Sequence, residues 1–163
     1  MKNISHITAV RITEFDPANQ PADNALGEIN FNSIPGKSLL LDLPLTSGSG
    51  SFVEEKLKNR AGPAYTKDVT LRVPRIYFSL EQALERFHSK AVTAMVTDAN
   101  ATTYLVFPLM LEYKKAVPGT IGSYRGYSLN LSGIGIKPAF FVKNIPSDVT
   151  FITLDESEGV LAD

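Results

Sequence analysis

The chain has 163 residues, with 16 basic and 17 acidic side chains and a formal net charge of −1. This length suits one domain, and 44% hydrophobic residues are enough to fill a single core. A near-neutral chain lacks the basic stripe with which proteins usually contact phosphates, so we expect no direct nucleic-acid binding. Because the chain has no cysteine, disulfides, thiolate catalysis, zinc ribbons and iron–sulfur clusters are excluded.

The sequence shows no segment suited to a membrane or to export. No apolar run follows the first six residues, so we expect no signal peptide. The longest apolar stretch, 104–111, is interrupted by Pro108 and is too short to span a bilayer. We therefore expect a soluble protein that is intracellular when made.

The first third of the chain predicts two strands and two irregular stretches. Residues 7–15 alternate weakly and end at Asp16-Pro17, which predicts a first strand. Residues 18–36 have the composition of an irregular connection. Residues 38–45 carry leucine at every second position, which predicts a strand. Residues 46–63 begin with a Gly/Ser-rich run, and we expect a long flexible loop there that could reach a neighbouring subunit.

The middle of the chain predicts a strand followed by a helix. Residues 66–73 alternate apolar and polar side chains, as in a half-buried strand. Residues 79–90 follow as a helix, in which Ser79 is expected to cap the first turn together with Gln82. The apolar residues of this segment recur at helical spacing and predict one buried stripe: Leu80, Ala83, Leu84 and Phe87.

Residues 91–113 form the clearest pattern in the chain. Two strand-like runs flank the turn-like Asp98-Ala99-Asn100-Ala101, which predicts a long β-hairpin. Further strands are expected at 124–132, 139–142 and 149–154. The elements predict an α+β fold, a mostly antiparallel β-sandwich or β-barrel-like sheet with one α-helix packed against it. They form a single β-rich domain over residues 1–154, and the acidic tail 155–163 follows.

No group of residues in the sequence indicates a catalytic, cofactor-binding or metal site. His6 and His88 are isolated, without further ligands at matching spacing. Gly48-Ser49-Gly50 and Gly133-Ile134-Gly135 resemble fragments of phosphate loops, but neither continues into a complete motif. Asp98 and Asn100 lack the glycine and glutamate of a calcium loop, so a tight turn is the better interpretation. We expect no cofactor, no metal and no enzymatic activity.

The remaining polar and aromatic residues have structural explanations. Glu54 and Glu55 are adjacent, as are Asp155 and Glu156, and neighbours on a regular backbone point apart. Five aromatic residues have strand spacing, and only a few basic residues accompany them, so core packing is the default: Tyr104, Phe107, Tyr113, Tyr124 and Tyr127. Exposed tyrosines on a β-domain would instead suit a ligand or carbohydrate, which we keep as the alternative function.

Three segments carry a resemblance to a known group of proteins: Leu71-Arg72-Val73-Pro74, Val96-Thr97-Asp98-Ala99-Asn100, and residues 127–133 with the sequence YSLNLSG. In these segments, and in the order of its elements from 66 to 141, the chain resembles small structural proteins of tailed bacteriophages and prophages, particularly those of Bacteroidetes hosts. The resemblance implies a non-enzymatic virion protein of the neck, ring or tail tube, made in the host cytoplasm. It implies self-association into a ring and contact with other virion structural proteins.

Overall fold

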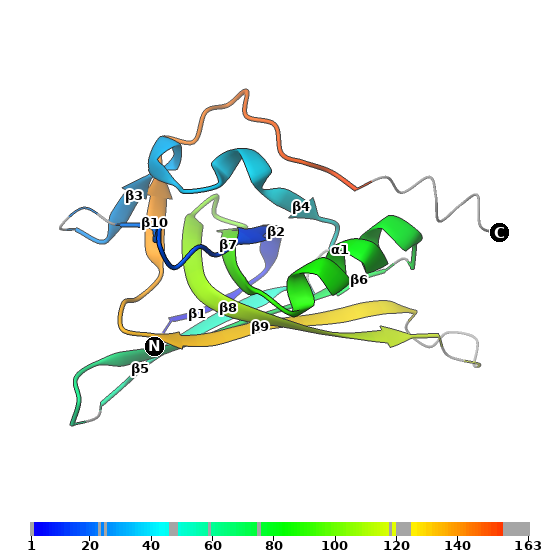
Figure 1. Cartoon of the computed structure of the whole chain (residues 1–163), viewed down its shortest axis with the longest axis horizontal. Helices are drawn as coiled ribbons and strands as arrows, with labels where there is room; N and C mark the ends of the chain where they lie inside the picture. The colour runs from blue at the N-terminus through cyan, green and yellow to red at the C-terminus, as the bar shows by residue number, and fades with distance from the viewer. Residues whose placement is uncertain are drawn as a thin grey trace.

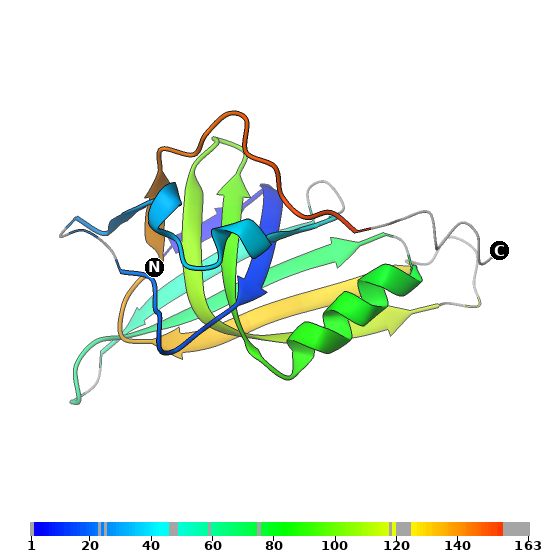
Figure 2. The same ribbon diagram turned by 45° about the horizontal axis from the view of Figure 1, so that its top comes forward.

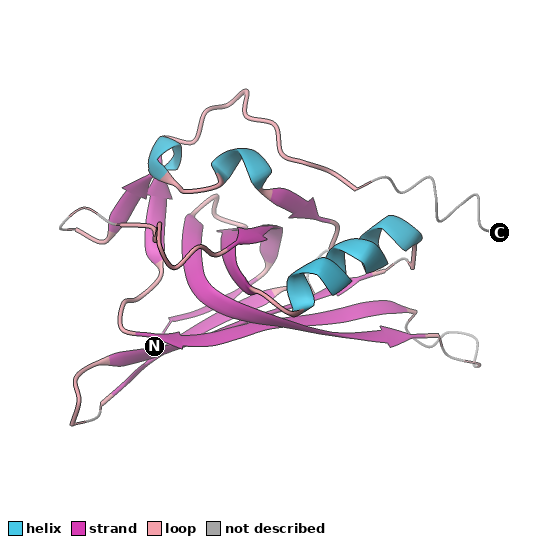
Figure 3. Cartoon of the chain, viewed as in Figure 1, coloured by secondary structure: helices cyan, strands magenta, loops and turns pink. Residues whose placement is uncertain are grey.

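A computed structural model describes residues 2–22, 24, 26–45, 49–58, 60–74, 76–117, 119 and 125–154, and the side chains from residue 6 onward. Ten strands are present: β1 (Lys2–Ser5), β2 (Ile7–Glu14), β3 (Glu28–Asn30), β4 (Leu41–Leu43), β5 (Ser51–Leu57), β6 (Ala64–Val73), β7 (Ala91–Asp98), β8 (Thr103–Ala116), β9 (Gly126–Gly135) and β10 (Phe140–Lys143). One α-helix, α1 (Phe78–His88), and two short 3-10 helices, η1 (Phe31–Ser33) and η2 (Lys37–Leu39), complete the described part (Figure 3).

The strands form one sheet in the order β1-β5-β6-β9-β8-β7-β2-β4, and each neighbouring pair is antiparallel. Only His6, with a φ of 59°, separates β1 from β2. The N-terminal segment therefore lies beside β5 through β1 and beside β7 through β2. As a result the sheet curves into a barrel-like shape (Figures 1 and 2). The predicted fold class, a mostly antiparallel sheet with one helix packed against it, is confirmed.

The β7–β8 hairpin is buried on both faces. One face, with α1 and the inner sides of the other strands, forms the inner core, which includes Val92, Val96 and Val106. The other face is covered by β3, η1 and β10, and Met95, Leu105 and Phe107 lie in this outer core. Strands that are buried on both faces need apolar residues at nearly every position. This explains why the predicted hairpin has so few polar residues.

Helix α1 packs beside the part of β8 that extends beyond β7. Pairing between β7 and β8 ends at Met110, whereas β8 continues to Ala116. The predicted apolar stripe is confirmed, because its four residues are buried in the inner core. The predicted capping role of Ser79 is wrong: the helix starts at Phe78, and Tyr77 occupies the N-cap without a side-chain bond. Tyr77 is only 3% exposed, so core packing of this residue determines where the helix begins.

The expected flexible loop 46–63 is wrong for its central part, where residues 51–57 form strand β5 between β1 and β6. Its inward-facing positions are Phe52 and Glu54, both buried. A glutamate at a buried position hides the apolar alternation that would have indicated a strand. Residues 46–48 and 59 lie outside the described residues.

Three further boundaries differ from the sequence prediction. In the predicted strand 38–45, residues 38 and 39 belong to η2, and the strand itself is limited to β4. Leu39 does not continue the buried alternation of this strand, because its side chain points outward and is 62% exposed. The predicted last strand, 149–154, makes a single bridge from Ile152 to Leu41. The irregular connection 18–36 contains β3 and η1.

Residues 2–5, which precede the predicted first strand, form β1. The tail 155–163 lies outside the described residues. None of the helices in the described ranges is long and apolar enough to cross a bilayer.

Replacement of Phe87 by alanine tests the inner core. Phe87 is 2% exposed, so we expect Phe87→Ala to lower the free energy of unfolding by about 3–5 kcal/mol. Urea denaturation monitored by circular dichroism measures this change. Gln82→Ala, on the exposed side of the same helix, is the control and should change stability by less than about 0.5 kcal/mol. A loss below about 1 kcal/mol for Phe87→Ala would mean that the helix does not contribute to the core as described.

Candidate functional site: an outer sheet face and a basic hairpin

Four neighbouring strands, β5, β6, β9 and β8, present polar side chains on the face opposite the inner core. We call this surface the outer sheet face. Cross-strand register aligns Ser51, Thr70, Asn130 and Glu112 in one row. The next row contains Arg72, Ser128 and Lys114. Because these strands are far apart in the sequence, only their register brings the polar side chains together.

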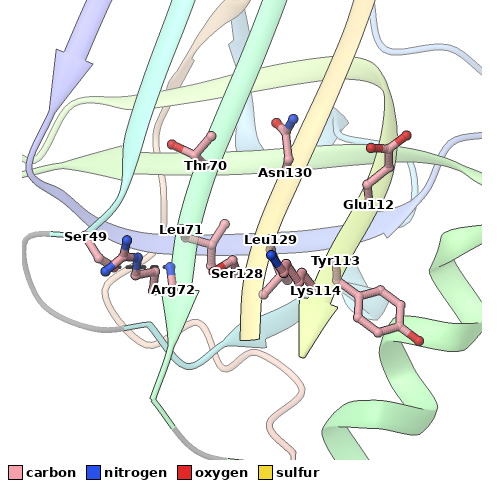
Figure 4. A pocket seen from close by; sticks show the side chains of 10 residues that line it. All are labelled: Ser49, Thr70, Leu71, Arg72, Glu112, Tyr113, Lys114, Ser128, Leu129 and Asn130. Carbon is pink, nitrogen blue, oxygen red and sulfur yellow. Dashed lines mark hydrogen bonds between the residues drawn. The ribbon is translucent and has the colours of Figure 1, made fainter. Parts of the chain in front are cut away.

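A shallow depression of about 600 Å³ lies on the outer sheet face. Figure 4 shows Thr70, Asn130 and Glu112 on three adjacent strands, with Tyr113 turned aside toward α1. The Asn130 Oδ1 atom is shielded from solvent and has no hydrogen-bond partner. The lining carries both charges and several amide and hydroxyl groups, which suits a polar contact with another molecule.

A second cluster joins α1 to the strands beneath it. The Tyr113 hydroxyl donates a hydrogen bond to Glu85, and the Lys115 ammonium lies 2.6 Å from Glu81 Oε1. The bond to Glu85, followed by burial, raises the pKa of Tyr113 to about 12. Burial and the nearby Glu81 also raise the pKa of Tyr127 well above its ordinary value. Both tyrosines therefore stay protonated near neutral pH, and the bonds of Tyr113 and Lys115 to α1 hold the helix on the sheet.

A third cluster contains two buried charged side chains, those of the cross-strand partners Glu54 and Lys67. Lys67 Nζ donates to the Phe107 carbonyl oxygen at 2.7 Å, and the Ala139 N–H donates to Glu54 Oε2 at 2.6 Å. Desolvation lowers the pKa of Lys67 to about 8, against the opposing effect of Glu54. The pair thus links β5 and β6 to β8 and to the segment before β10.

Gly133 and Gly135 of the segment Gly133-Ile134-Gly135 lie close to Pro108 and Lys67. A Cβ atom on Gly135 would lie 3.2 Å from Lys67 Nζ, and one on Gly133 would overlap the Pro108 carbonyl oxygen. Close packing therefore explains these glycines. Gly50 likewise lies against Ile7 at the start of β5, and Gly48 lies outside the described residues.

The inward turn of Glu54 changes the surface of the β5–β6 hairpin. Lys56, Lys58 and Arg60 remain exposed, with Glu55 as the exposed acidic neighbour. We call these three cations and the turn that carries them the basic hairpin. Within the described ranges, neither Lys58 nor Arg60 forms an ion pair. In the sequence Glu54 and Glu55 stand beside these cations, and the fold removes Glu54 from the surface.

The two histidines lie apart. His6 is exposed at the junction of β1 and β2, and His88 is exposed at the end of α1, with its ring edge against Tyr113. Among the described residues, no three histidine or carboxylate side chains lie close enough together to hold a metal ion.

The turn interpretation of Asp98 is confirmed. Asp98 Oδ1 accepts hydrogen bonds from the backbone N–H groups of Asn100 at 2.9 Å and Thr102 at 3.0 Å. Ala101 adopts a φ of 62°, a conformation that glycine would adopt more easily. The carboxylate is therefore used within the turn.

The expected core packing of the aromatic residues is confirmed for three of them. Tyr104, Phe107 and Tyr127 are buried, whereas Tyr113 is half-buried and Tyr124 lies outside the described residues. Glu54 and Glu55 point to opposite faces of their strand, as predicted. Asp155 and Glu156 lie beyond the described residues.

The ionisation of Lys67 predicts a characteristic pH dependence of stability. The pKa is about 8 in the folded protein and near 10.5 in an exposed lysine, so between these values the unfolded chain binds more protons. The free energy of unfolding should therefore gain a contribution that rises from pH 8 to 9.5. In urea denaturation, the free energy of unfolding of Lys67→Met should lack this rise with pH. The free energy of unfolding of the exposed control Lys90→Met should keep it. An equal rise in both variants would contradict the assignment.

The hydrogen bond of Tyr113 predicts a second titration effect. Glu85→Gln removes the carboxylate that retains the tyrosine proton, so the pKa of Tyr113 should fall from about 12 toward 10. Ultraviolet spectrophotometric titration of the folded protein measures this shift. Glu112→Gln, on the outer sheet face, should leave the profile unchanged. An unshifted profile for Glu85→Gln would show that this bond does not control the tyrosine.

Comparison with known proteins does not assign this arrangement to a group. No protein-family model, curated protein or solved structure matches the chain. The function therefore has to be argued from the outer sheet face, the basic hairpin and the side chains around them.

Proposed function

We propose that this protein is a non-enzymatic structural component of a virion that self-associates, as a ring in the neck or tail of a tailed phage. The observation that carries the proposal is the set of large apolar side chains exposed where β9 ends. Ile134 is 64% exposed on the outer sheet face, and Ile136, just beyond it, is 79% exposed. Met110, on the neighbouring strand β8, is 48% exposed. Exposed apolar groups rimmed by polar ones are typical of protein contacts.

The remaining features suit such a role. Hydrogen-bonded clusters hold α1 and the β10 segment on the sheet, so the subunit can present its surfaces in a fixed geometry. If one surface of a subunit contacts a different surface of the next, the repeated rotation produces a closed ring or a helical filament. No chemical step is required, and the partners are other copies and other virion structural proteins.

Native mass spectrometry and electron microscopy at high protein concentration test this function. We expect one defined subunit number. Ile134→Asp should weaken assembly at least tenfold while leaving the circular dichroism spectrum unchanged. The matched control Leu39→Asp, which is equally exposed on η2, should assemble normally. A monomer at every concentration would contradict the proposed function.

The alternative is a domain that binds a ligand or carbohydrate. The depression around Asn130 favours it, because its volume of about 600 Å³ is in the range of small-molecule sites. Exposed tyrosines do not support it: Tyr77, Tyr104 and Tyr127 are buried, and Tyr113 turns aside. A monomer that binds an oligosaccharide and loses this binding in Asn130→Ala would favour the alternative.

A further inference from the structure

Two cations of the basic hairpin, Lys58 and Arg60, form no ion pair in the described part of their own subunit, and Lys56 lies 5.9 Å from the centroid of the Tyr65 ring. The hairpin projects from the barrel-like body at the end where β5 turns into β6 (Figures 1 and 2). Lys56, Lys58 and Arg60 are exposed on it, and Glu54 is turned away to bind Ala139. A local excess of positive charge attracts an acidic segment.

The same chain contains such a segment at its C-terminal end. Residues 155–163 have the sequence DESEGVLAD, with four acidic side chains and no basic residue. Seventeen acidic side chains less these four leave 13 against 16 basic ones in residues 1–154. The tail and the remainder of the chain therefore carry opposite net charges.

The dimensions of the subunit keep the acidic residues at the start of the tail away from the hairpin of its own chain. Leu154 packs on the inner core and lies beside Tyr77. Tyr77 follows the last residue of β6 by four positions, so Leu154 lies near that end of the strand. The hairpin lies at the opposite end of β6, and the ten residues of this strand span about 30 Å. Even in a fully extended chain, Asp155, Glu156 and Glu158 lie within about 14 Å of Leu154. The acidic cluster can therefore reach only the hairpin of another copy.

We propose that the acidic tail, residues 155–163, of one copy binds the basic hairpin of the next copy. The inference rests on the proposed self-association and specifies its contact. The tail leaves the subunit near Tyr77, and the hairpin projects from the other end, so the contact joins two different surfaces. A contact of this type propagates from copy to copy and closes into a ring when the rotation permits. Because the contact depends on charge, it weakens as ionic strength rises.

Charge reversal tests the contact by native mass spectrometry. The hairpin variant Lys56→Glu/Lys58→Glu/Arg60→Glu should raise the concentration for half-assembly at least tenfold. The tail variant Asp155→Lys/Glu156→Lys/Glu158→Lys should have the same effect. A chain that carries both sets should regain assembly, because the attraction is restored with the signs exchanged. Failure of the combined variant to recover any assembly, with its fold intact by circular dichroism, would overturn the proposal.

A matched control separates this contact from a general effect of net charge. Arg86→Glu/Lys90→Glu/Lys143→Glu changes the net charge by the same amount at exposed positions away from the hairpin. We expect this variant to assemble like the natural chain. Loss of assembly in the control equal to that in the hairpin variant would assign the effect to net charge and overturn the tail contact.

Disulfide cross-linking tests the contact directly, since the chain has no cysteine. Ser157→Cys and Ala61→Cys are placed in separate chains, one of which carries a mass tag, and the two are mixed under mild oxidation. We expect a mixed disulfide dimer in high yield. Gln82→Cys, which is exposed on α1, replaces Ala61→Cys in the control and should give little product.

The two proposals fail in different ways. Assembly that persists unchanged in both charge-reversal variants, with cross-linking no higher than the control, would overturn the tail contact and leave self-association intact. If the natural chain stays monomeric at every concentration, self-association is overturned. The tail contact, which rests on self-association, is then overturned with it.

Discussion

The architecture depends on the burial of the β7–β8 hairpin on both faces. Val92 and Val96 face the inner core, while Met95 and Leu105 face the outer core, so the same two strands form the wall between both. Burial of apolar surface on both sides favours this hairpin over any arrangement that exposes one face to water. The barrel-like sheet with α1 is assembled on one face, and β3, η1 and β10 cover the other.

Polar links then fix the surrounding elements to this wall. Lys67 binds the Phe107 carbonyl of β8, while Glu54 binds the backbone ahead of β10. Burial of a charged side chain is costly unless its hydrogen bonds are satisfied, and here both side chains have backbone partners. The pair also has a consequence for the surface. With Glu54 inside, the exposed β5–β6 hairpin retains three cations against Glu55.

This charge separation connects the core with the proposed assembly. A rigid body that carries a basic hairpin at one end and an acidic tail at the other has different surfaces available for a neighbouring copy. Ile134 and Ile136 lie at the end of β9, whose residue Gly135 pairs with Tyr65 near the hairpin turn. Apolar contact could therefore supply affinity where electrostatic attraction supplies orientation. The polar outer sheet face would then be the wet periphery of the same contact.

The sequence by itself determined the elements whose pattern is local. The strand at 66–73, the hairpin at 91–113 and the apolar stripe of the helix all follow from the spacing of neighbouring residues, and Asp98 identified its own turn. The absence of cysteine also follows from the sequence alone.

The tertiary structure decided what depends on partners distant in the chain. Strand β5 was missed because the buried position of Glu54 is stabilised by Lys67 and Ala139, and Leu39 faces outward despite its place in an alternating run. The outer sheet face had no sequence signal because strand register creates it. The cations of the basic hairpin are close together in the sequence, but only the inward direction of Glu54 separates them from its carboxylate.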